Sequence, residues 1–232
     1  MLELRIQAYH YICNMLNLVK ELVIKDIRLN GRERYAFYSM ILYLLCTSYI
    51  SFLCFEGRID DRSWIALFWI IVLFTAINAS LHSFKRELNQ QALFYFTIVN
   101  PRAIILSKII YNSGLLVILT LGSFLIYSIF LGSPVLAYFP FLGCLILGST
   151  ALASILTLVA AIASKTNNSS GLMAVLSMPL LFPLLLNLIK TSQICLVETQ
   201  FISVGNQILF LALLNIVSVL LSYLLFPYLW RD

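Results

Sequence analysis

Long apolar stretches alternate with short polar segments along the chain, and this pattern predicts six membrane-spanning helices. A bilayer core about 30 Å thick is crossed by roughly 20 apolar residues in helical form. The six predicted spans cover residues 35–55, 64–81, 104–131, 135–163, 171–189 and 204–230. The predicted connections cover residues 56–63, 82–103, 132–134, 164–170 and 190–203. The pattern therefore predicts an all-α integral membrane fold.

The N-terminal segment, residues 1–34, has a different pattern. Its apolar side chains recur at the spacing of an amphipathic helix. They are Ile12, Leu16, Val19, Val23 and Ile27. Six Lys or Arg and four acidic residues make the segment too polar to span, so we expect it to lie along the membrane surface. The predicted organisation is an amphipathic cytoplasmic helix over residues 1–34 and a six-span domain over residues 35–232.

Composition agrees with a membrane protein. Of the 232 residues, 61% are hydrophobic and 11% are charged, whereas soluble domains carry about 25% charged residues. Six spans leave no room for a sizeable soluble domain. The sequence also lacks the G-x-x-x-x-G-K-S/T phosphate loop, which many ATP-hydrolysing proteins use. A soluble enzyme and a self-contained ATPase are therefore excluded.

Basic residues indicate the orientation, because Lys and Arg near a span resist translocation. Twelve of the 15 belong to the side that holds the N-terminal segment, the 82–103 and 164–170 connections and the C-terminal tail. The other side holds Arg58, Arg62 and Lys190. Both termini are therefore predicted to be cytoplasmic. This asymmetry explains the net charge of +5, and no basic face on a soluble module indicates nucleic-acid binding.

The predicted spans carry almost no ionisable side chains. Lys108 and Lys190 lie at predicted helix ends, where we expect them to extend to the lipid headgroups. No carboxylate lies within a span as a proton relay, which disfavours an ion-coupled carrier. The hydrolase motifs G-x-S-x-G and H-E-x-x-H are absent, as are paired carboxylates. The sequence therefore predicts no catalytic residue, no metal site and no cofactor.

Histidine and tryptophan indicate no binding site. His10 is expected to be solvated and His82 to be interfacial, in preference to haem or metal ligation. Trp64, Trp69 and Trp230 fall at or near predicted span ends. That position is typical of the aromatic belt at membrane interfaces.

The cysteines are odd in number and include no C-x-x-C pair. Most are expected to be buried thiols that pack as small hydrophobic side chains. Cys54 and Cys195 both fall near the predicted outer face, so a disulfide between them is a weaker alternative.

Polar and small residues within the spans allow two interpretations. Four asparagines lie in predicted spans, at Asn78, Asn112, Asn187 and Asn215. Each amide needs a partner in hydrocarbon, so they indicate either hydrogen bonds between helices or a polar translocation path. In the fourth span, Ala153, Thr157 and Ala161 have the small-residue spacing that permits close helix packing.

Two prolines lie on one face of the fifth predicted span. Pro179 and Pro183 are four residues apart, and each removes a backbone hydrogen bond, so a bend or break is expected there. Such a bend can be purely structural. Broken helices are equally typical of the sites where transport proteins hold cargo or open.

The 82–103 connection has its own pattern. Leu88, Ala92 and Tyr95 lie on one helical face, and a break at Asn100 and Pro101 follows. This predicts a short cytoplasmic surface helix at about residues 84–101. Such a helix can dock into a groove of a partner protein, or it can lie on lipid.

These residues resemble a loop of ABC-2 type permeases, in which an acidic residue precedes Gly-Thr-Leu, Ser-Pro and Gly-Lys steps. Here Arg86-Glu87 supplies the acidic position, Gln91-Ala92-Leu93 stands for Gly-Thr-Leu, Asn100-Pro101 for Ser-Pro and Ser107-Lys108 for Gly-Lys. The order is the same, with several substitutions. Within that superfamily the chain most resembles the haem exporter protein B family, through its length, its six spans, its basic N-terminal helix and the run over residues 177–185. The resemblance covers about residues 21–232.

The resemblance implies a non-catalytic permease-type subunit in a bacterial inner membrane. Its partners would be a separate ABC ATP-binding subunit, other cytochrome c maturation membrane proteins and a periplasmic haem chaperone, and a homodimer is left open. It would couple the partner's ATP hydrolysis to haem export or to release of the haem-loaded chaperone. Coupling would then involve Arg86, Glu87, Gln91, Ala92, Leu93, Asn100, Pro101 and Lys108.

Two alternatives share the predicted fold. An ABC-2 permease could export a lipid, a polyketide or a drug, and a neighbouring reading frame for a tryptophan-rich haem-handling protein would argue against it. A membrane assembly scaffold would carry nothing, and a complex without ATP-dependent conformational change would favour it.

Overall fold

The computed structural model describes residues 15, 17–28, 34–56, 59–90, 101–163, 169–197 and 201–230. Its named helices are α2 (Arg34–Phe55), α3 (Asp61–Gln90), α5 (Pro101–Leu131), α6 (Tyr138–Ala163), α7 (Ser169–Val197) and α8 (Phe201–Trp230). The described part of the chain contains no strand. Each of these six helices has an apolar stretch long enough to cross a membrane. The predicted all-α membrane fold with six spans is therefore confirmed.

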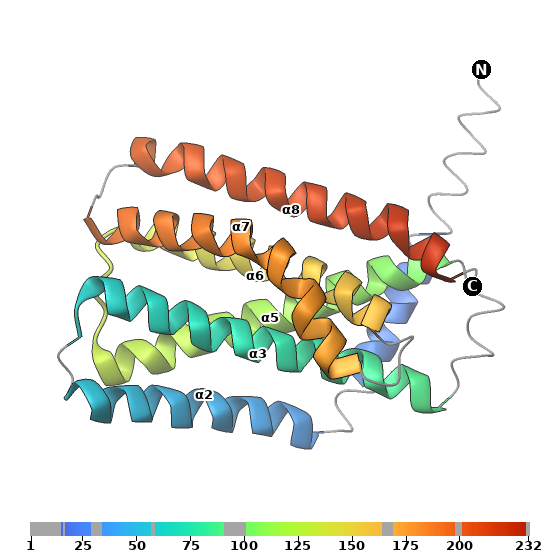
Figure 1. Cartoon of the computed structure of the whole chain (residues 1–232), viewed down its shortest axis with the longest axis horizontal. Helices are drawn as coiled ribbons and strands as arrows, with labels where there is room; N and C mark the ends of the chain where they lie inside the picture. The colour runs from blue at the N-terminus through green and yellow to red at the C-terminus, as the bar shows by residue number, and fades with distance from the viewer. Residues whose placement is uncertain are drawn as a thin grey trace.

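The helices form one bundle with α6 in its interior (Figure 1). Helix α6 packs against α3, α5, α7 and α8. Helix α2 packs against α3 and α5, and it lies on the side of the bundle opposite α8. A stable structure in lipid must satisfy its backbone hydrogen bonds, and helices satisfy most of theirs internally.

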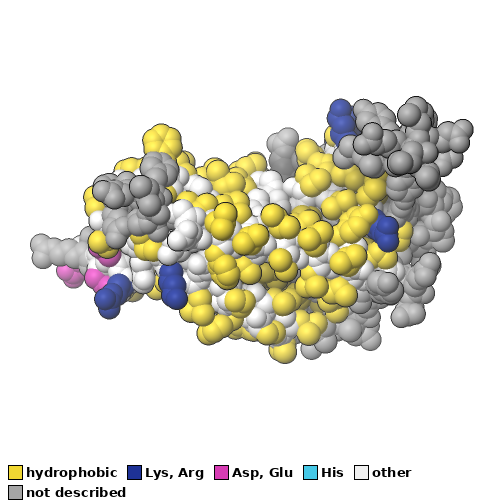
Figure 2. All heavy atoms as spheres, turned by 90° about the horizontal axis from the view of Figure 1, so that it is seen from above, with side chains coloured by type: hydrophobic (Ala, Val, Ile, Leu, Met, Phe, Trp, Pro, Cys, Tyr) yellow, Lys and Arg dark blue, Asp and Glu magenta, His cyan; other side chains and the backbone are white. Residues whose placement is uncertain are grey.

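The outer surface of the bundle is apolar over most of the face seen in Figure 2, and charged side chains gather toward its two ends. Helices α2 and α8 contribute many of the exposed large apolar residues, such as Leu42 and Ile50 on α2 and Leu209 and Leu224 on α8. In water such a surface would aggregate. In a bilayer it faces the acyl chains, as a six-span protein requires.

Small residues let α6 lie close to its neighbours. Ala153, Thr157 and Ala161 are all buried, as their spacing predicts. At Gly148 the approach is closest, because an added Cβ would lie 2.6 Å from Leu188 Cδ2 of α7 and 3.1 Å from Trp69 Cη2 of α3. Close packing of this kind holds helices together in lipid, where hydrophobic burial gives no net driving force.

Two helices extend beyond the C-terminal ends of their predicted spans. Helix α3 continues from the predicted span end at Leu81 to Gln90, and α7 continues beyond Lys190 to Val197. The segment 82–90 is rich in residues with good helix propensity, such as Lys, Arg, Glu, Leu and Gln. A drop in hydropathy therefore marks where an apolar stretch ends, and the helix itself can continue.

The first turn of α3 is capped by Asp60. Its carboxylate accepts a hydrogen bond from the Ser63 amide at 3.2 Å, and its carbonyl accepts one from the Trp64 amide at 2.9 Å. Hydrogen bonds from the side chain and the backbone of Ser63 hold the pKa of Asp60 below its ordinary value. The charged carboxylate therefore satisfies an amide that would otherwise lack a helical partner.

A buried aromatic group, here called the Trp64 cluster, joins α3, α5 and α6 at one end of the bundle. Its members are Trp64, Phe68, Phe124, Tyr127 and Phe141. The Trp64 ring lies 5.6 Å from Phe68 and 5.1 Å from Tyr127 between centroids. The Trp64 indole also donates a 3.0 Å hydrogen bond to the carbonyl of Gly132, whose φ of +75° favours glycine where α5 ends.

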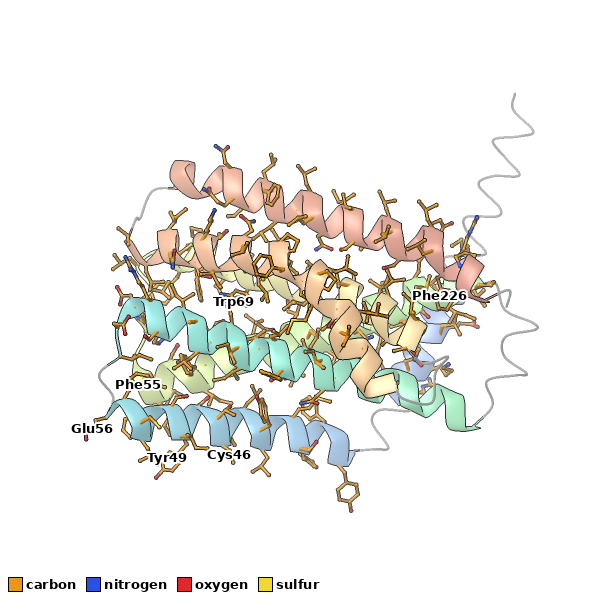
Figure 3. The ribbon with its side chains drawn as sticks, viewed as in Figure 1. Cys46, Tyr49, Phe55, Glu56, Trp69 and Phe226 are labelled. Carbon is orange, nitrogen blue, oxygen red and sulfur yellow. The ribbon has the colours of Figure 1, made fainter. Side chains whose placement is uncertain are left out.

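The prediction of an aromatic belt is wrong for two of the three tryptophans. Trp64 and Trp69 are 0% and 2% exposed. Trp69 lies within the bundle (Figure 3), and its indole donates to the Ser192 hydroxyl of α7 at 2.9 Å. Position near a span end does not decide which side of the helix a residue faces, and both of these side chains face inward.

Candidate functional site

The structure places the predicted coupling residues around the α3–α5 connection. Arg86 and Glu87 lie in the last turns of α3, and Pro101 is the first residue of α5. Lys108 follows two turns later in the same helix. The other predicted members, Gln91, Ala92, Leu93 and Asn100, lie outside the described residues.

Lys108 forms an ion pair with Asp26 of the N-terminal helical segment, residues 17–28. The Lys108 Nζ and Asp26 Oδ2 atoms are 3.1 Å apart, and each side chain is 5% exposed. The expectation that Lys108 extends to the lipid headgroups is therefore wrong. An acid from another helix reaches Lys108, so the charge of the lysine is paired inside the protein.

Because this ion pair is buried, breaking it would cost more free energy than breaking a pair on the surface. Removing two charges from water costs several kcal/mol for each ion, and close pairing offsets most of that cost. A second cation, Lys25 Nζ, lies 3.4 Å from Asp26 Oδ1, but the Lys25 side chain is 28% exposed. Lys108 is therefore the buried cationic partner of Asp26, and loss of either member would remove a close opposite charge from a buried group.

The face that the 17–28 helix turns toward the bundle coincides only in part with the predicted apolar face. Val19 is buried and Val23 packs against the core, as that face allows, but Leu22 and Asp26 are also buried and Ile27 is 56% exposed. Ile12 and Leu16, which belong to the predicted face, lie outside the described residues. An exposed apolar side chain can face lipid at little cost, but a carboxylate needs a partner, so Asp26 faces inward.

Further polar contacts join the first turns of α5 to other helices. Asn112, one turn beyond Lys108, donates a 2.8 Å hydrogen bond to the Thr157 hydroxyl of α6. The Arg102 guanidinium carbon lies 5.3 Å from the centroid of the Tyr223 ring on α8, a cation–π geometry. The beginning of α5 is therefore tied to residues 17–28, α6 and α8.

Hydroxyl and amide groups also line the contact between α6 and α8. Asn215 of α8 donates to the Thr150 hydroxyl, and the Ser154 and Ser218 hydroxyl oxygens are 2.6 Å apart. Asn187 of α7 donates to the Gln207 carbonyl of α8 at 3.3 Å.

These contacts favour the interhelical interpretation of the asparagines. Asn112, Asn187 and Asn215 each donate to another helix, as the interhelical interpretation predicts. Asn78 is exposed on the surface of α3. In this structure three of the four amides therefore stabilise helix packing.

Helix α7 contains both predicted bend residues. Pro179 and Pro183 lie inside the helix and are exposed. Helix α7 runs from Ser169 to Val197 through both prolines and changes direction near its middle (Figure 1). The bend therefore lies on the outer side of the bundle, where the missing amide donors do not disturb internal contacts.

No metal or disulfide site is found in the part of the chain that the structure describes. In this part, no three His, Cys, Asp or Glu residues are arranged so that they could hold a metal ion. Cys54 is exposed, Cys195 is buried, and both are free thiols. The Cys54–Cys195 disulfide, the weaker alternative, is therefore not formed. His82 lies in the last part of α3, and His10 is outside the described residues.

Sequence reasoning missed two features of this site. The apolar pattern did not indicate that Asp26 is buried, because its sequence neighbours belong to the polar side of an amphipathic helix. The Trp64 cluster had only a weak signal, the spacing of Trp64 and Phe68 on one helical face.

A sequence model of the CcmB protein family matches residues 17–229. The chain belongs to the CcmB protein family. The match begins at the 17–28 helix and includes Asp26, Lys108 and nearly all of α8. A comparison with curated protein sequences gives no match.

Membership of the CcmB family indicates the general role of the protein. CcmB proteins are membrane components of haem-export ABC systems in cytochrome c maturation. They work with an ABC ATP-binding subunit and other cytochrome c maturation proteins. The protein is accordingly a multi-pass membrane subunit of a transporter.

Proposed function

We propose that this protein converts ATP hydrolysis by a separate ATP-binding subunit into movement of its own spans. That movement would serve haem export or release of the haem-loaded periplasmic chaperone, and the protein itself would catalyse no reaction. The observation that carries the proposal is the CcmB family match, which extends over the six-span bundle and the preceding helix.

The α3–α5 connection is the proposed contact with the ATP-binding subunit. Helix α3 continues to Gln90, beyond the end of its predicted span at Leu81. This extension carries Arg86 and Glu87 away from the apolar part of the bundle, toward a partner outside the lipid. A helical projection of this kind can transmit a push as a rigid element.

The proposed location is the bacterial inner membrane, with both termini in the cytoplasm. Two observations support this orientation. Most basic residues belong to segments on one predicted side, where the positive-inside rule places the cytoplasm. The 17–28 helix also contacts α5 near its first residues, so the proposed coupling segment and the N-terminal helix share one end of the bundle.

Deletion of the gene and complementation with variants test this function. Deletion should abolish covalent haem in periplasmic cytochromes c. Glu87→Lys and Ala92→Pro should lower mature cytochrome c about tenfold, the range of typical coupling energies, while membrane insertion is retained. Glu56→Lys, a charge reversal at the exposed end of α2, is the matched control and should behave as wild type.

A different result would refute each part of the proposed function. A deletion strain with normal cytochromes c would refute the role in maturation. Unchanged copurification of the ATP-binding subunit and unchanged cytochrome c in both variants would refute the assignment of the connection. Accessibility tags that place residues 86–101 outside the cell would refute the orientation.

A further inference from the structure

The Asp26–Lys108 pair joins two elements that are distant in sequence. One member lies in the 17–28 helix and the other in the second turn of α5, shortly after the proposed coupling segment. Both side chains are nearly inaccessible, with 5% exposure each. The position of this pair in the fold, rather than its charge alone, indicates a mechanical role.

The first two turns of α5 are largely buried. Ala103, Ile104, Ile105 and Ser107 are buried beside Lys108. Because close-packed side chains transmit displacement instead of absorbing it, a push on Pro101 would move these turns together. The contacts of Arg102 with α8 and of Asn112 with α6 would carry the same displacement into the bundle.

The 17–28 helix is also attached to the bundle by apolar side chains. Val19 and Leu22 are buried, Leu18 and Val23 are partly buried against the core, and Ile24 and Ile27 are exposed. Apolar contacts of this kind can be exchanged for lipid at little cost, whereas pulling Asp26 away from Lys108 separates two close opposite charges in a buried setting. The ion pair is therefore a directed contact through which this helix can follow α5.

We propose that Asp26 is a positioning residue for Lys108, and that their ion pair fixes the 17–28 helix to the first turns of α5 so that both move as one unit. This inference rests on the proposed function for the source of the movement. It goes further by assigning the transmission between the coupling segment and the N-terminal helix to two named side chains. Loss of Asp26 would then uncouple ATP hydrolysis from its output without preventing hydrolysis.

The first test measures attachment and needs no ATP-binding subunit. Hydrogen exchange of residues 17–28 is followed for the full chain in lipid nanodiscs. Asp26→Asn should accelerate exchange in this helix about tenfold, and α6 should be unchanged. The exchanged pair Asp26→Lys with Lys108→Asp should restore slow exchange, and Glu21→Gln, which removes an exposed acid from the same helix, should have no effect.

The second test measures coupling in the assembled complex. With Asp26→Asn, ATP hydrolysis by the purified complex should stay within about twofold of wild type, while mature cytochrome c in cells falls about tenfold. A purely structural defect would lower both together, through loss of the complex. The charge exchange, or the conservative Asp26→Glu, should restore cytochrome c.

The contrary results are distinct from those of the proposed function. Unchanged exchange in Asp26→Asn, a charge exchange that restores neither measurement, or a parallel loss of hydrolysis and cytochrome c would overturn the role of the pair. If Asp26→Asn does not accumulate, the charge exchange carries the test, and its failure to accumulate also overturns the proposal. A wild-type complex without ATP hydrolysis would instead refute the proposed function, whatever the exchange result.

Discussion

The two ends of the bundle are held together by different kinds of contact. At one end the Trp64 cluster packs five aromatic rings from three helices, with no charged group among them. At the other end, the Asp26–Lys108 pair, the Arg102–Tyr223 contact and the Asn112–Thr157 hydrogen bond join four elements. One end is apolar and interlocked, and the other is polar and assembled from a few directed contacts.

This difference indicates where the bundle can move. Interlocked aromatic rings lose close packing and ring–ring contacts when they separate, and fluid acyl chains replace these contacts less well. Hydrogen bonds and cation–π contacts, such as those of Asn112 and Arg102, can be exchanged for water or for other polar partners. The 17–28 helix and the first turns of α5, joined by the Asp26–Lys108 pair, are therefore expected to move relative to α6 and α8, while the Trp64 end acts as a fixed base.

The largest expected effect comes from the fixed end. Trp64→Ala should lower the free energy of unfolding by about 3–5 kcal/mol, because it opens a cavity among buried rings and leaves the Gly132 carbonyl without its donor. Denaturant unfolding in detergent micelles measures this change. Trp64→Phe keeps a ring and loses the N–H donor, so it should cost about 1 kcal/mol. Similar costs for the two variants would contradict the assigned packing role.

Breaking the polar end should cost somewhat less. Lys108→Met leaves Asp26 buried beside the partly exposed Lys25, so we expect a loss of about 3 kcal/mol, the lower end for broken buried pairs. The same unfolding assay, combined with hydrogen exchange, should show faster exchange in residues 17–28 and little change near Trp64. The control Lys190→Met removes an exposed lysine and should change stability by less than about 0.5 kcal/mol. Equal effects of the two lysine variants would contradict the comparison.

A smaller effect is expected where α6 meets α7 and α3. Gly148→Ala should lower the unfolding free energy by about 1–3 kcal/mol, because the new methyl group would overlap Leu188 and approach Trp69. Gly143→Ala lies in the same helix with no atom within 4 Å of the added Cβ, so it should be neutral or stabilising by about 0.5–1 kcal/mol. A destabilising Gly143 variant would show that glycine at α6 matters for a reason other than close approach.

The smallest effect is local and depends on pH. The folded pKa of Asp60 is lowered from its ordinary value of 3.8, so its capping contribution is present above that value and is lost as the pH falls through the lowered pKa. Hydrogen exchange in the first turn of α3, corrected for the intrinsic rate, should therefore rise on acidification. Asp60→Asn should abolish this pH dependence, and Asp61→Asn should retain it. Persistence of the pH dependence in Asp60→Asn would assign it to another group.

Much of the architecture could be predicted from hydropathy, but the depth of each helix in the bundle could not. Helices α6 and α8 have similar mean hydropathy, 2.2 and 2.6, yet 72% of the α6 stretch is buried and only 17% of the α8 stretch. Hydropathy measures transfer from water into an apolar medium, and lipid is as apolar as a protein interior. The small residues of α6 indicated its central position better, because close helix packing favours small side chains.

The candidate site was predictable only in its outline. The order of the steps from Arg86 to Lys108 carried the resemblance to the haem exporter protein B family, and the family match agrees with it. The predicted environment of Lys108 at the lipid headgroups was wrong, because nothing in the sequence pattern indicated that Asp26 would contact this lysine. Contacts between residues so far apart depend on how helices are rotated and packed, and local spacing contains neither quantity.

The amino-acid sequence by itself determined that this chain is a six-span helical membrane protein of a recognisable family, because a bilayer imposes length and polarity on each span separately. The tertiary structure alone decided that Trp64 and Trp69 face inward, that α6 is central and that Asp26 neutralises Lys108. These features depend on which faces of different helices meet, and lipid accepts either face of an apolar helix until packing and polar pairing select one.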